Sequence, residues 1–252
     1  MRQEVRINLE RKFIDSIFLN KNIEEHSYLY HLPIVQYLMK DNVIRFENDV
    51  TFFVGENGTG KSTLLEAIAV AYGFNPEGGT KNFTFSTNDT HSELCDYLTV
   101  SRSKYAKDGF FLRAESFYNV ATNIEELDKE VPLLQSYGGI SLHKQSHGES
   151  FLALVQNRFG GNGLYILDEP EAALSPSRLL TLIAEIDNLV KNNSQFIIAT
   201  HSPILIAFPN AKIYQLTETG MEAVSYRQTE HYQLTRSFLE NPEKMLRYLL
   251  ED

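Results

Sequence analysis

The strongest constraint in this sequence is a glycine-rich segment that lies between an apolar run and an amphipathic stretch. It reads Gly55-Glu56-Asn57-Gly58-Thr59-Gly60-Lys61-Ser62-Thr63, which matches G-x-x-x-x-G-K-[ST] at every fixed position. Glycines let successive backbone N–H groups of such a loop point at phosphate oxygens, and the start of the following helix adds a favourable dipole. Lys61 is expected to reach the β- and γ-phosphates, and Ser62 to offer its hydroxyl to Mg²⁺. The segment therefore predicts a strand–loop–helix unit that binds a nucleoside triphosphate.

Four short runs are apolar at consecutive positions and rich in β-branched or aromatic residues, as in strands buried on both faces of a sheet. They lie at residues 49–54, 109–112, 164–167 and 195–199. Amphipathic stretches at 61–72 and 177–190 alternate with these runs, and apolar residues follow one helical face in the second stretch. Strands that alternate with helices predict an α/β fold with a mostly parallel central sheet.

Three other regions depart from this alternation. The N-terminal 48 residues are expected to add antiparallel strands and a short helix near 34–39. The polar, glycine-containing region that begins at residue 118 predicts a small inserted helical subdomain at about 118–160. A hairpin is expected at 212–226 and a helix at 242–250, which together make a C-terminal hairpin and helix at 208–252. All of these belong to one expected domain of residues 1–252.

Composition excludes several functional classes. The net charge is −10, and no basic arm is present that could grip nucleic acid unaided. A single cysteine, Cys95, excludes a disulfide framework and a cysteine-built zinc site. No apolar run approaches the roughly 20 residues that a membrane helix needs, and the N-terminal residues lack the apolar core of a signal peptide. We therefore expect a cytoplasmic protein with no transmembrane segment.

The third apolar run ends in two acids, Asp168 and Glu169. Acids at the C-terminal tip of a buried strand lie in the crevice where α/β sheets bind their ligands. Asp168 is suited to the coordination shell of Mg²⁺, and Glu169 can polarise a water molecule aimed at the γ-phosphate, with Lys61 stabilising the charge. The alternative is an Asp-Glu pair that merely opens a surface loop.

Four elements, in order, resemble the ABC-class P-loop ATPases over residues 43–205. The glycine-rich loop (Walker A) comes first, and the strand that ends in Asp168 and Glu169 (Walker B) is the third element. The second is Ser146-His147-Gly148-Glu149, which is similar to the signature motif in its S-x-G-E form, and the fourth is Ala199-Thr200-His201-Ser202, which resembles the switch-histidine strand. Glu169 is followed by proline and a second glutamate, which gives the sequence Glu-Pro-Glu, and no long coiled coil precedes the signature motif. The chain thus resembles a stand-alone ATPase of the SMC/RecF/OLD-like branch.

The resemblance implies Mg²⁺-dependent hydrolysis of ATP in a homodimer that sandwiches the nucleotide. Ser146, His147, Gly148 and Glu149 of one copy would close over ATP held by the loop of the other, since one chain cannot point two anion-binding helix ends at the same phosphate. His201 would contact the γ-phosphate or the attacking water. Dimer formation and release would then act as a switch or motor on a protein or nucleic-acid partner. Taken alone, the signature is only a capped helix, and a histidine at a strand end is usually structural.

Two residues have open roles. Transporter ATPases carry a glutamine after the strand that follows the loop helix, whereas this chain offers Arg113 and Glu115 there. Glu115 is either a metal ligand or an ion-pair partner of Arg113. Tyr30 lies about two dozen residues before Gly55, where ABC transporters stack an aromatic on the base, although core packing is the default for a tyrosine.

Two alternative functions stay open from the sequence. An ATPase subunit of a membrane transporter would need a coupling surface for its membrane partner, and the missing glutamine counts against it. A nucleotide-gated binding module would bind ATP with negligible turnover. Histidines outside the four motifs, such as His143 and His231, are expected at the surface or in ordinary hydrogen bonds.

Overall fold

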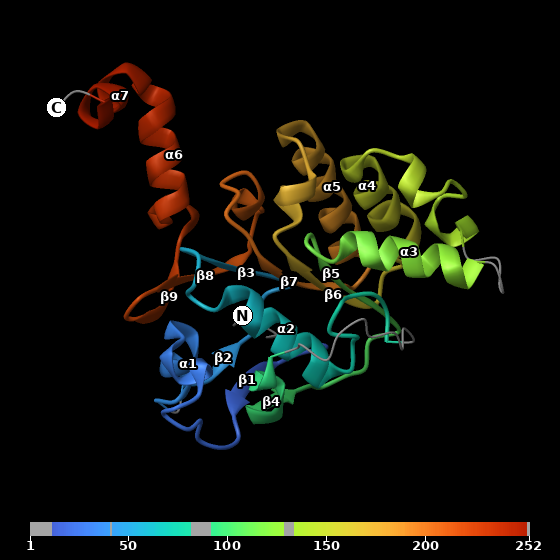
Figure 1. Cartoon of the computed structure of the whole chain (residues 1–252), viewed down its shortest axis with the longest axis horizontal. Helices are drawn as coiled ribbons and strands as arrows, with labels where there is room; N and C mark the ends of the chain where they lie inside the picture. Colours follow the sequence, from blue (N-terminus) through green and yellow to red (C-terminus); the bar gives the residue numbers. More distant parts are fainter. Residues whose placement is uncertain (1–11, 41, 82–91, 129–133, 251–252) are drawn as a thin grey trace, which may run out of the picture.

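The computed structural model describes residues 12–40, 42–81, 92–128 and 134–250, and these residues form two sheets (Figure 1). The larger sheet has the strand order β5-β6-β7-β3-β8-β9. Its strands are β3 (Val50–Gly55), β5 (Asp108–Arg113), β6 (Gly163–Asp168), β7 (Gln195–Ala199), β8 (Lys212–Thr217) and β9 (Gly220–Val224). All neighbours up to β8 are parallel, and β9 pairs with β8 in the antiparallel sense.

The central strands are apolar at consecutive positions because both faces of the larger sheet are covered. Along β3, the Phe52 side chain joins the core on one face and Phe53 joins the core on the other. On β7, the Phe196 side chain likewise joins the first core and the Ile197 side chain joins the second. Side chains alternate between the faces of a strand, so a sheet buried on both sides needs an apolar residue at every position.

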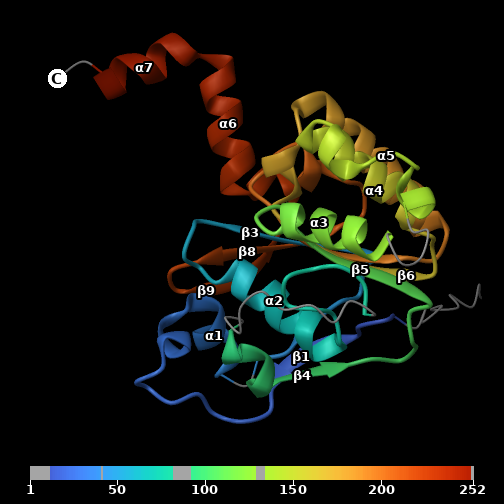
Figure 2. The ribbon, with the colours of Figure 1, turned by 45° about the vertical axis from the view of Figure 1, so that its right-hand side comes forward.

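Helices cover one face of the larger sheet, and helices together with the smaller sheet cover the other (Figures 1 and 2). The first face carries α3 (Phe117–Asp128), α4 (His147–Arg158) and α5 (Pro176–Lys191), with the short 3-10 helices η3 (Leu134–Tyr137), η4 (Leu142–Lys144) and η5 (Pro170–Ala173). The second carries α1 (Pro33–Leu38), α2 (Lys61–Tyr72), η1 (Tyr28–His31) and η2 (Glu93–Tyr97). The smaller sheet is antiparallel, in the order β2 (Ile44–Arg45), β1 (Ser16–Leu19), β4 (Leu98–Ser101).

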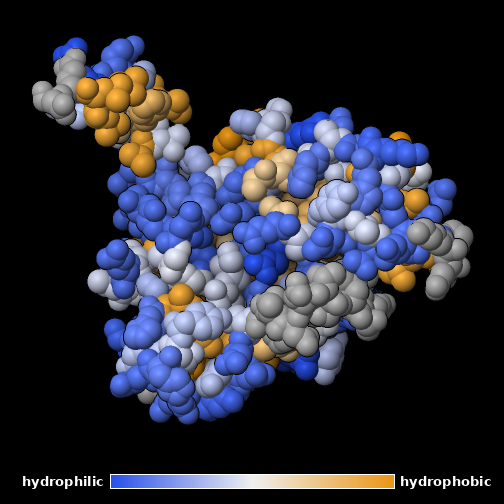
Figure 3. Space-filling view, in the orientation of Figure 1, coloured by the Kyte–Doolittle hydropathy of each residue, from blue (hydrophilic) through white to orange (hydrophobic). Residues whose placement is uncertain are grey.

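The C-terminal part of the chain leaves the sheet as a helical arm. After η6 (Leu205–Ala207), the β8–β9 hairpin and η7 (Tyr226–Gln228), the chain forms α6 (Glu230–Glu240) and α7 (Pro242–Leu250). We call residues 230–250 the C-terminal arm; it projects from the body and exposes apolar side chains (Figures 1 and 3). None of its residues is buried. Within the described ranges, no helix combines the length and apolar character that crossing a bilayer requires.

The α/β class, the mostly parallel sheet and the antiparallel N-terminal strands are confirmed. The four predicted core strands lie where the apolar runs indicate, and α2 has the bounds of its amphipathic stretch. The strand β4 and the helix α6 were not predicted. The extent of the domain, 1–252, and of the helical insertion, 118–160, stay predictions, although α3, η3, η4 and α4 are all helical segments on one face of the sheet.

Candidate functional site

Three neighbouring strands bring the predicted site residues to one edge of the larger sheet. The strands β6, β7 and β3 are adjacent and parallel, so their carboxyl ends meet at the same edge. β3 runs into the glycine-rich loop, β6 ends at Asp168, and β7 is followed by Thr200 and His201. This is the edge at which open parallel sheets bind their ligands.

The glycine-rich loop, residues 55–62, has an open side. A Cβ at Gly55 would lie 2.3 Å from the carbonyl oxygen of Leu216, and a Cβ at Gly60 would lie 2.6 Å from Cγ2 of Ile34, so both glycines permit close packing. Gly58 differs, because a Cβ there would meet nothing within 4 Å and only its φ of +83° favours glycine. The loop is therefore packed at its two ends and has room for a ligand at Gly58.

The helix α2 begins at this loop without a capping side chain. Gly60 is its N-cap, with a φ of +93°, and a glycine has no side chain that could accept a hydrogen bond from the first turn. The first N–H groups of a helix have no partner within the helix, and the helix dipole there favours negative charge. An anion such as phosphate would satisfy both requirements.

Lys61 is buried at the start of α2 and folds back onto the loop. Its Nζ donates hydrogen bonds to the carbonyl oxygens of Gly55, at 2.7 Å, and Glu56, at 3.0 Å. Burial lowers the pKa of the lysine, whereas the nearby charges of Glu169 and Asp168 act to raise it. A buried ammonium that donates to neutral carbonyl groups is an electrostatic complement to an incoming phosphate.

Ser62 and Asp168 form a pair suited to Mg²⁺. The Ser62 hydroxyl donates to Oδ1 of Asp168 at 3.0 Å, across the gap between α2 and β6. The Asp168 side chain is almost fully buried, and burial raises its pKa to about 6, while Arg113 and the Ser62 hydrogen bond act to lower it. A hydroxyl and a carboxylate are oxygen ligands of the kind that Mg²⁺ prefers, and Mg²⁺ usually takes its remaining ligands from water and substrate phosphates. In the described residues, no cluster of three or more His, Cys, Asp or Glu side chains forms a metal site, which is compatible with this open arrangement.

Arg113, at the end of β5, lies beside the metal candidates. Its guanidinium forms an ion pair with Glu66 of α2, and its Nε lies 3.7 Å from Oδ2 of Asp168. The predicted metal candidate Glu115 has an exposed side chain, whose Oε2 lies 3.7 Å from Nη2 of Arg113. Of its two open roles, the ion pair is the one present in these contacts. Glu66 was not singled out from the sequence, because a single acid in an amphipathic helix carries no motif.

Glu169 and His201 face one another at the ends of β6 and β7. Glu169 Oε1 lies 3.5 Å from His201 Nε2, and the Glu169 backbone has a φ of +49°, which is uncommon for a residue other than glycine. The backbone N–H of Glu169 donates to the carbonyl oxygen of Ala199 at 3.0 Å, which ties the two strand ends together. His201 Nε2 makes no hydrogen bond within the described part of the chain. The carboxylate and the imidazole therefore lie side by side, and both are close enough to Lys61 for its charge to interact with theirs.

Glu171 holds Thr200 and His201, which we call the switch segment, in place. Sequence reasoning did not assign this role to Glu171. Its carboxylate accepts hydrogen bonds from the Thr200 hydroxyl, at 2.7 Å, and from the backbone N–H of His201. Burial raises its pKa, and these two hydrogen bonds act to lower it. The only sequence signal for Glu171 is the Glu-Pro-Glu pattern that begins at Glu169.

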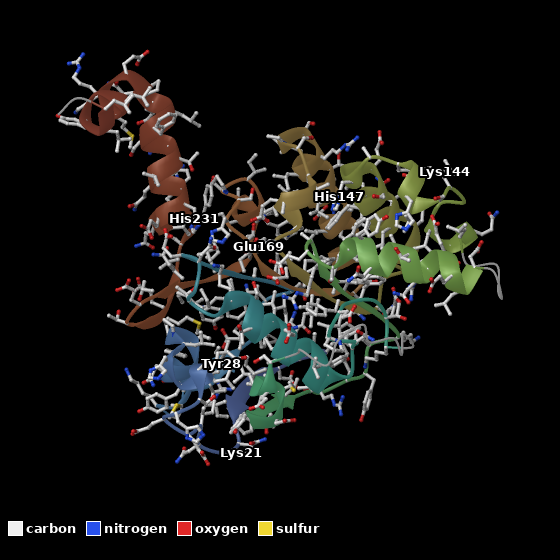
Figure 4. The ribbon with its side chains drawn as sticks, viewed as in Figure 1. Lys21, Tyr28, Lys144, His147, Glu169 and His231 are labelled. Atoms are coloured by element: carbon white, nitrogen blue, oxygen red, sulfur yellow. The ribbon has the colours of Figure 1, made fainter. Side chains whose placement is uncertain are left out.

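His231, from the first turn of α6, is a second residue that sequence reasoning missed. Its Nε2 lies 3.0 Å from Nδ1 of His201, within hydrogen-bond distance, and the centroids of the two rings are 5.1 Å apart. Figure 4 labels Glu169 at the edge of the sheet and His231 at the base of the C-terminal arm. Burial and the charge of Lys61 lower the pKa of both histidines. No motif surrounds His231, so only the fold could place it here.

The signature segment forms the N-terminus of α4, on the face that carries α3 and α5. Ser146 is the N-cap, and together with Glu149 it makes a capping box in which the backbone N–H of Ser146 donates to Glu149 at 2.9 Å. Arg178 of α5 donates to the Ser146 hydroxyl at 3.2 Å and pairs with Glu149. A Cβ at Gly148 would lie 2.8 Å from the carbonyl oxygen of Ala173, and the His147 ring packs on Phe117. These residues contact α3, α5 and η5 of their own chain.

Tyr30 lies in η1, close along the chain to residues that contact the glycine-rich loop. The backbone N–H of Ile34 donates to the Thr59 carbonyl oxygen at 3.4 Å, and Ile34 packs against Gly60. The Tyr30 side chain is half-buried, packs against the core and meets the His31 ring edge-on. This position leaves both expectations for Tyr30, base stacking and core packing, as predictions.

Comparison with known proteins identifies a family, several relatives and a similar fold. A family model described as an AAA domain matches residues 27–197. A ribose import ATP-binding protein of Halalkalibacterium halodurans is 27% identical over 65% of this chain and 36% of its own length, so the chain spans about a third of that relative. An uncharacterised ABC transporter ATP-binding protein of Haemophilus influenzae is 25% identical over 68% of this chain and 71% of its own. Among solved structures, cbiO1 of Clostridium perfringens, described as part of the ABC transporter complex cbiONQ, covers 96% of this chain and 100% of its own with a TM-score of 0.50 at 17% identity, a likeness of fold.

Proposed function

Because the chain belongs to the AAA domain family and is an ABC-class P-loop ATPase, we propose that two copies bind ATP and Mg²⁺ between them and separate when ATP is hydrolysed. The observation that carries this proposal is the convergence of three strand ends. The loop with Lys61 and Ser62, the acids Asp168 and Glu169, and His201 lie on neighbouring parallel strands. Binding, metal and water-activating groups are thereby together at one ligand-binding edge.

The residues of the loop bind the triphosphate. The backbone N–H groups at the start of α2 and the ammonium of Lys61 hold the phosphate oxygens, with Lys61 exchanging its two carbonyl partners for them. Ser62 and Asp168 hold Mg²⁺, which neutralises charge on the β- and γ-phosphates when bound. The substrate is thus fixed with its terminal phosphate toward the ends of β6 and β7.

Glu169 and His201 promote the attack of water. Glu169 accepts the proton as the water oxygen forms a bond to the γ-phosphorus and the bond to the bridging oxygen breaks, which releases ADP and phosphate. His201 donates a hydrogen bond from Nε2 to an oxygen of the γ-phosphate, where negative charge is held in the transition state. Ser146, Gly148 and the first turn of α4 from the second copy complete the phosphate shell.

Hydrolysis is tested by phosphate release from the wild type and from Glu169→Gln. We expect the variant to bind ATP with unchanged affinity and to lose turnover by about 10²–10⁴-fold, the usual contribution of a general base. Glu222→Gln, on the exposed face of β9, is the matched control and should turn over as the wild type does. Binding of ATP without Mg²⁺-dependent phosphate release from the wild type would instead identify a nucleotide-gated binding module.

A second candidate is the ATP-binding subunit of a membrane importer. The names of the relatives that match this chain favour it, since they include import ATP-binding proteins. The strand that should be followed by the transporter glutamine ends instead at Arg113, which is engaged with Glu66 and Asp168, and the absence of a glutamine from residues 113–116 favours the first candidate. Co-purification of the full chain with a membrane-embedded protein would support the importer over a switch that acts on a protein or nucleic-acid partner.

A further inference from the structure

We propose that His231 is a positioning residue for hydrolysis, which acts by fixing the hydrogen of His201 on Nε2, where it faces Glu169 and the terminal phosphate. The inference rests on the proposed function, because it assigns a task to the same site. It adds a residue from the C-terminal arm, outside the four motifs and outside the matched residues 27–197.

The position of His231 is held by several contacts at the start of α6. Thr229 is fully buried and caps the helix, accepting a hydrogen bond from the backbone N–H of Tyr232 at 3.3 Å. The backbone N–H of Glu230 donates to the side chain of Gln215 on β8 at 3.1 Å. The base of α6 is therefore tied to the sheet, while the rest of the helix is exposed. This places the His231 ring against His201 with little freedom to move.

The hydrogen bond between the rings has two possible directions. Because burial lowers the pKa of both histidines, each ring is neutral at neutral pH and carries one N–H. If His201 donated from Nδ1, its Nε2 would be a bare lone pair 3.5 Å from the Glu169 carboxylate, with two acceptors facing each other. If His231 donates from Nε2, His201 carries its hydrogen on Nε2 and directs a donor at the carboxylate. Electrostatics favours the second direction.

The direction matters because a phosphate oxygen must meet a donor. A lone pair on His201 Nε2 would repel the γ-phosphate, whereas an N–H group stabilises the charge that it carries. Partners that hold the far nitrogen of a functional histidine fix both its hydrogen and its ring orientation. Without His231, His201 would be free to carry its hydrogen on Nδ1 and would lose this donor for part of the time.

The kinetic test compares His231→Gln with His231→Leu. Gln keeps an N–H donor with similar reach and should retain single-turnover hydrolysis within about threefold, whereas Leu should slow it by about 10–100-fold, the effect typical of lost supporting partners. ATP affinity should stay unchanged in both variants, because the ring of His231 is hydrogen-bonded to His201 and His201, rather than His231, is proposed to meet the phosphate. His143→Leu, which removes an exposed histidine on η4, is the matched control and should behave as the wild type. Equal rates for the Leu and Gln variants would overturn the proposal.

The spectroscopic test needs no turnover. Long-range ¹H–¹⁵N spectra of the nucleotide-free protein at pH 7.5 report which nitrogen of His201 carries the hydrogen; we expect Nε2 in the wild type and a shift toward Nδ1 in His231→Leu. A wild-type His201 that carries its hydrogen on Nδ1, or a spectrum unchanged in His231→Leu, would refute the positioning role. A wild type that shows the expected form but releases no phosphate would overturn the proposed hydrolysis, and His231 would then only fix the hydrogen of His201 on Nε2.

Discussion

Asp168 meets two opposing demands at the scale of a single residue. The proposed function requires a carboxylate there to bind Mg²⁺, yet the end of β6 is buried and the side chain is only 7% exposed. Burial raises its pKa to about 6 from the ordinary value of 3.8. The folded chain therefore binds a proton at Asp168 more tightly than the unfolded chain does, and stability contributed by the neutral acid is lost as the pH rises between these two values.

Replacing Asp168 with asparagine should stabilise the protein while it removes metal binding. The amide oxygen can still accept from Ser62, but the side chain no longer ionises. In EDTA above pH 6, we expect the free energy of unfolding to rise by about 1–3 kcal/mol, since one unit of pKa shift corresponds to about 1.4 kcal/mol. The gain should vanish near pH 4. Denaturant titrations from pH 4 to 8 measure it, and a gain that does not depend on pH would refute this origin.

Glu171 tests whether the switch segment must be held rigidly. Glu171→Ala removes a half-buried acceptor for the hydroxyl of the fully buried Thr200 and for the backbone N–H of His201. We expect a loss of stability of about 1–3 kcal/mol, the usual cost of unsatisfied buried donors. Turnover should also fall, because His201 loses its anchor. Glu171→Gln keeps one acceptor oxygen, so its stability and turnover should lie between those of the wild type and those of Glu171→Ala. Unfolding curves and phosphate release measure the two quantities. A Glu171→Ala variant with wild-type turnover would show that His201 needs no anchor.

At the scale of elements, the N-terminus of α4 can separate a structural role from a functional one. Ser146→Ala removes the capping hydroxyl, which should cost about 1 kcal/mol of stability, and it also removes the group proposed to close over ATP in the second copy. Ser92→Ala deletes a comparable cap at the start of η2, away from the phosphate loop. We expect similar losses of stability but loss of ATP-induced dimerisation only in Ser146→Ala. Gly148 is unsuited to this test, because added volume there clashes with Ala173.

The core strands and the first helix could be predicted because their residues have strong local patterns. The strand β7 has the predicted bounds because both faces of the sheet are covered and every position of the strand is apolar or buried. The helix α2 has the predicted bounds because a fixed motif marks its start. The roles assigned to Ser146, Tyr30 and Glu115 depend on contacts with a nucleotide or a second copy. Those roles stay predictions, whereas the ion pair of Glu115 with Arg113 is present in the structure.

The missed features depend on contacts between distant parts of the chain. The helix α6 carries apolar side chains at helical spacing, but none of its residues is buried, so no core of this chain requires a helix there. His231 reaches His201 only because β8 pairs beside β3 and the chain then returns over the carboxyl edge of the sheet. Glu66 and Glu171 likewise gain their partners through strand order rather than through sequence spacing.

At the scale of the whole molecule, the proposed function assigns two helix N-termini of the chain to phosphate binding. The start of α2 is uncapped and faces the phosphate site, and the start of α4 is capped by its own Ser146 and Glu149. Because the two belong to different faces of the same sheet, we assign the second to the nucleotide of another copy. The C-terminal arm begins at Glu230, one residue before His231, and exposes apolar side chains along its length.

Dimerisation of the Glu169→Gln variant tests the ATP sandwich most directly. Light scattering after size exclusion would give its mass without nucleotide, with Mg²⁺ and ADP, and with Mg²⁺ and ATP, while bound nucleotide is counted. We expect one chain in the first two conditions and two chains with two ATP molecules in the third. A single chain that carries one tightly bound ATP in the third condition would contradict the shared site.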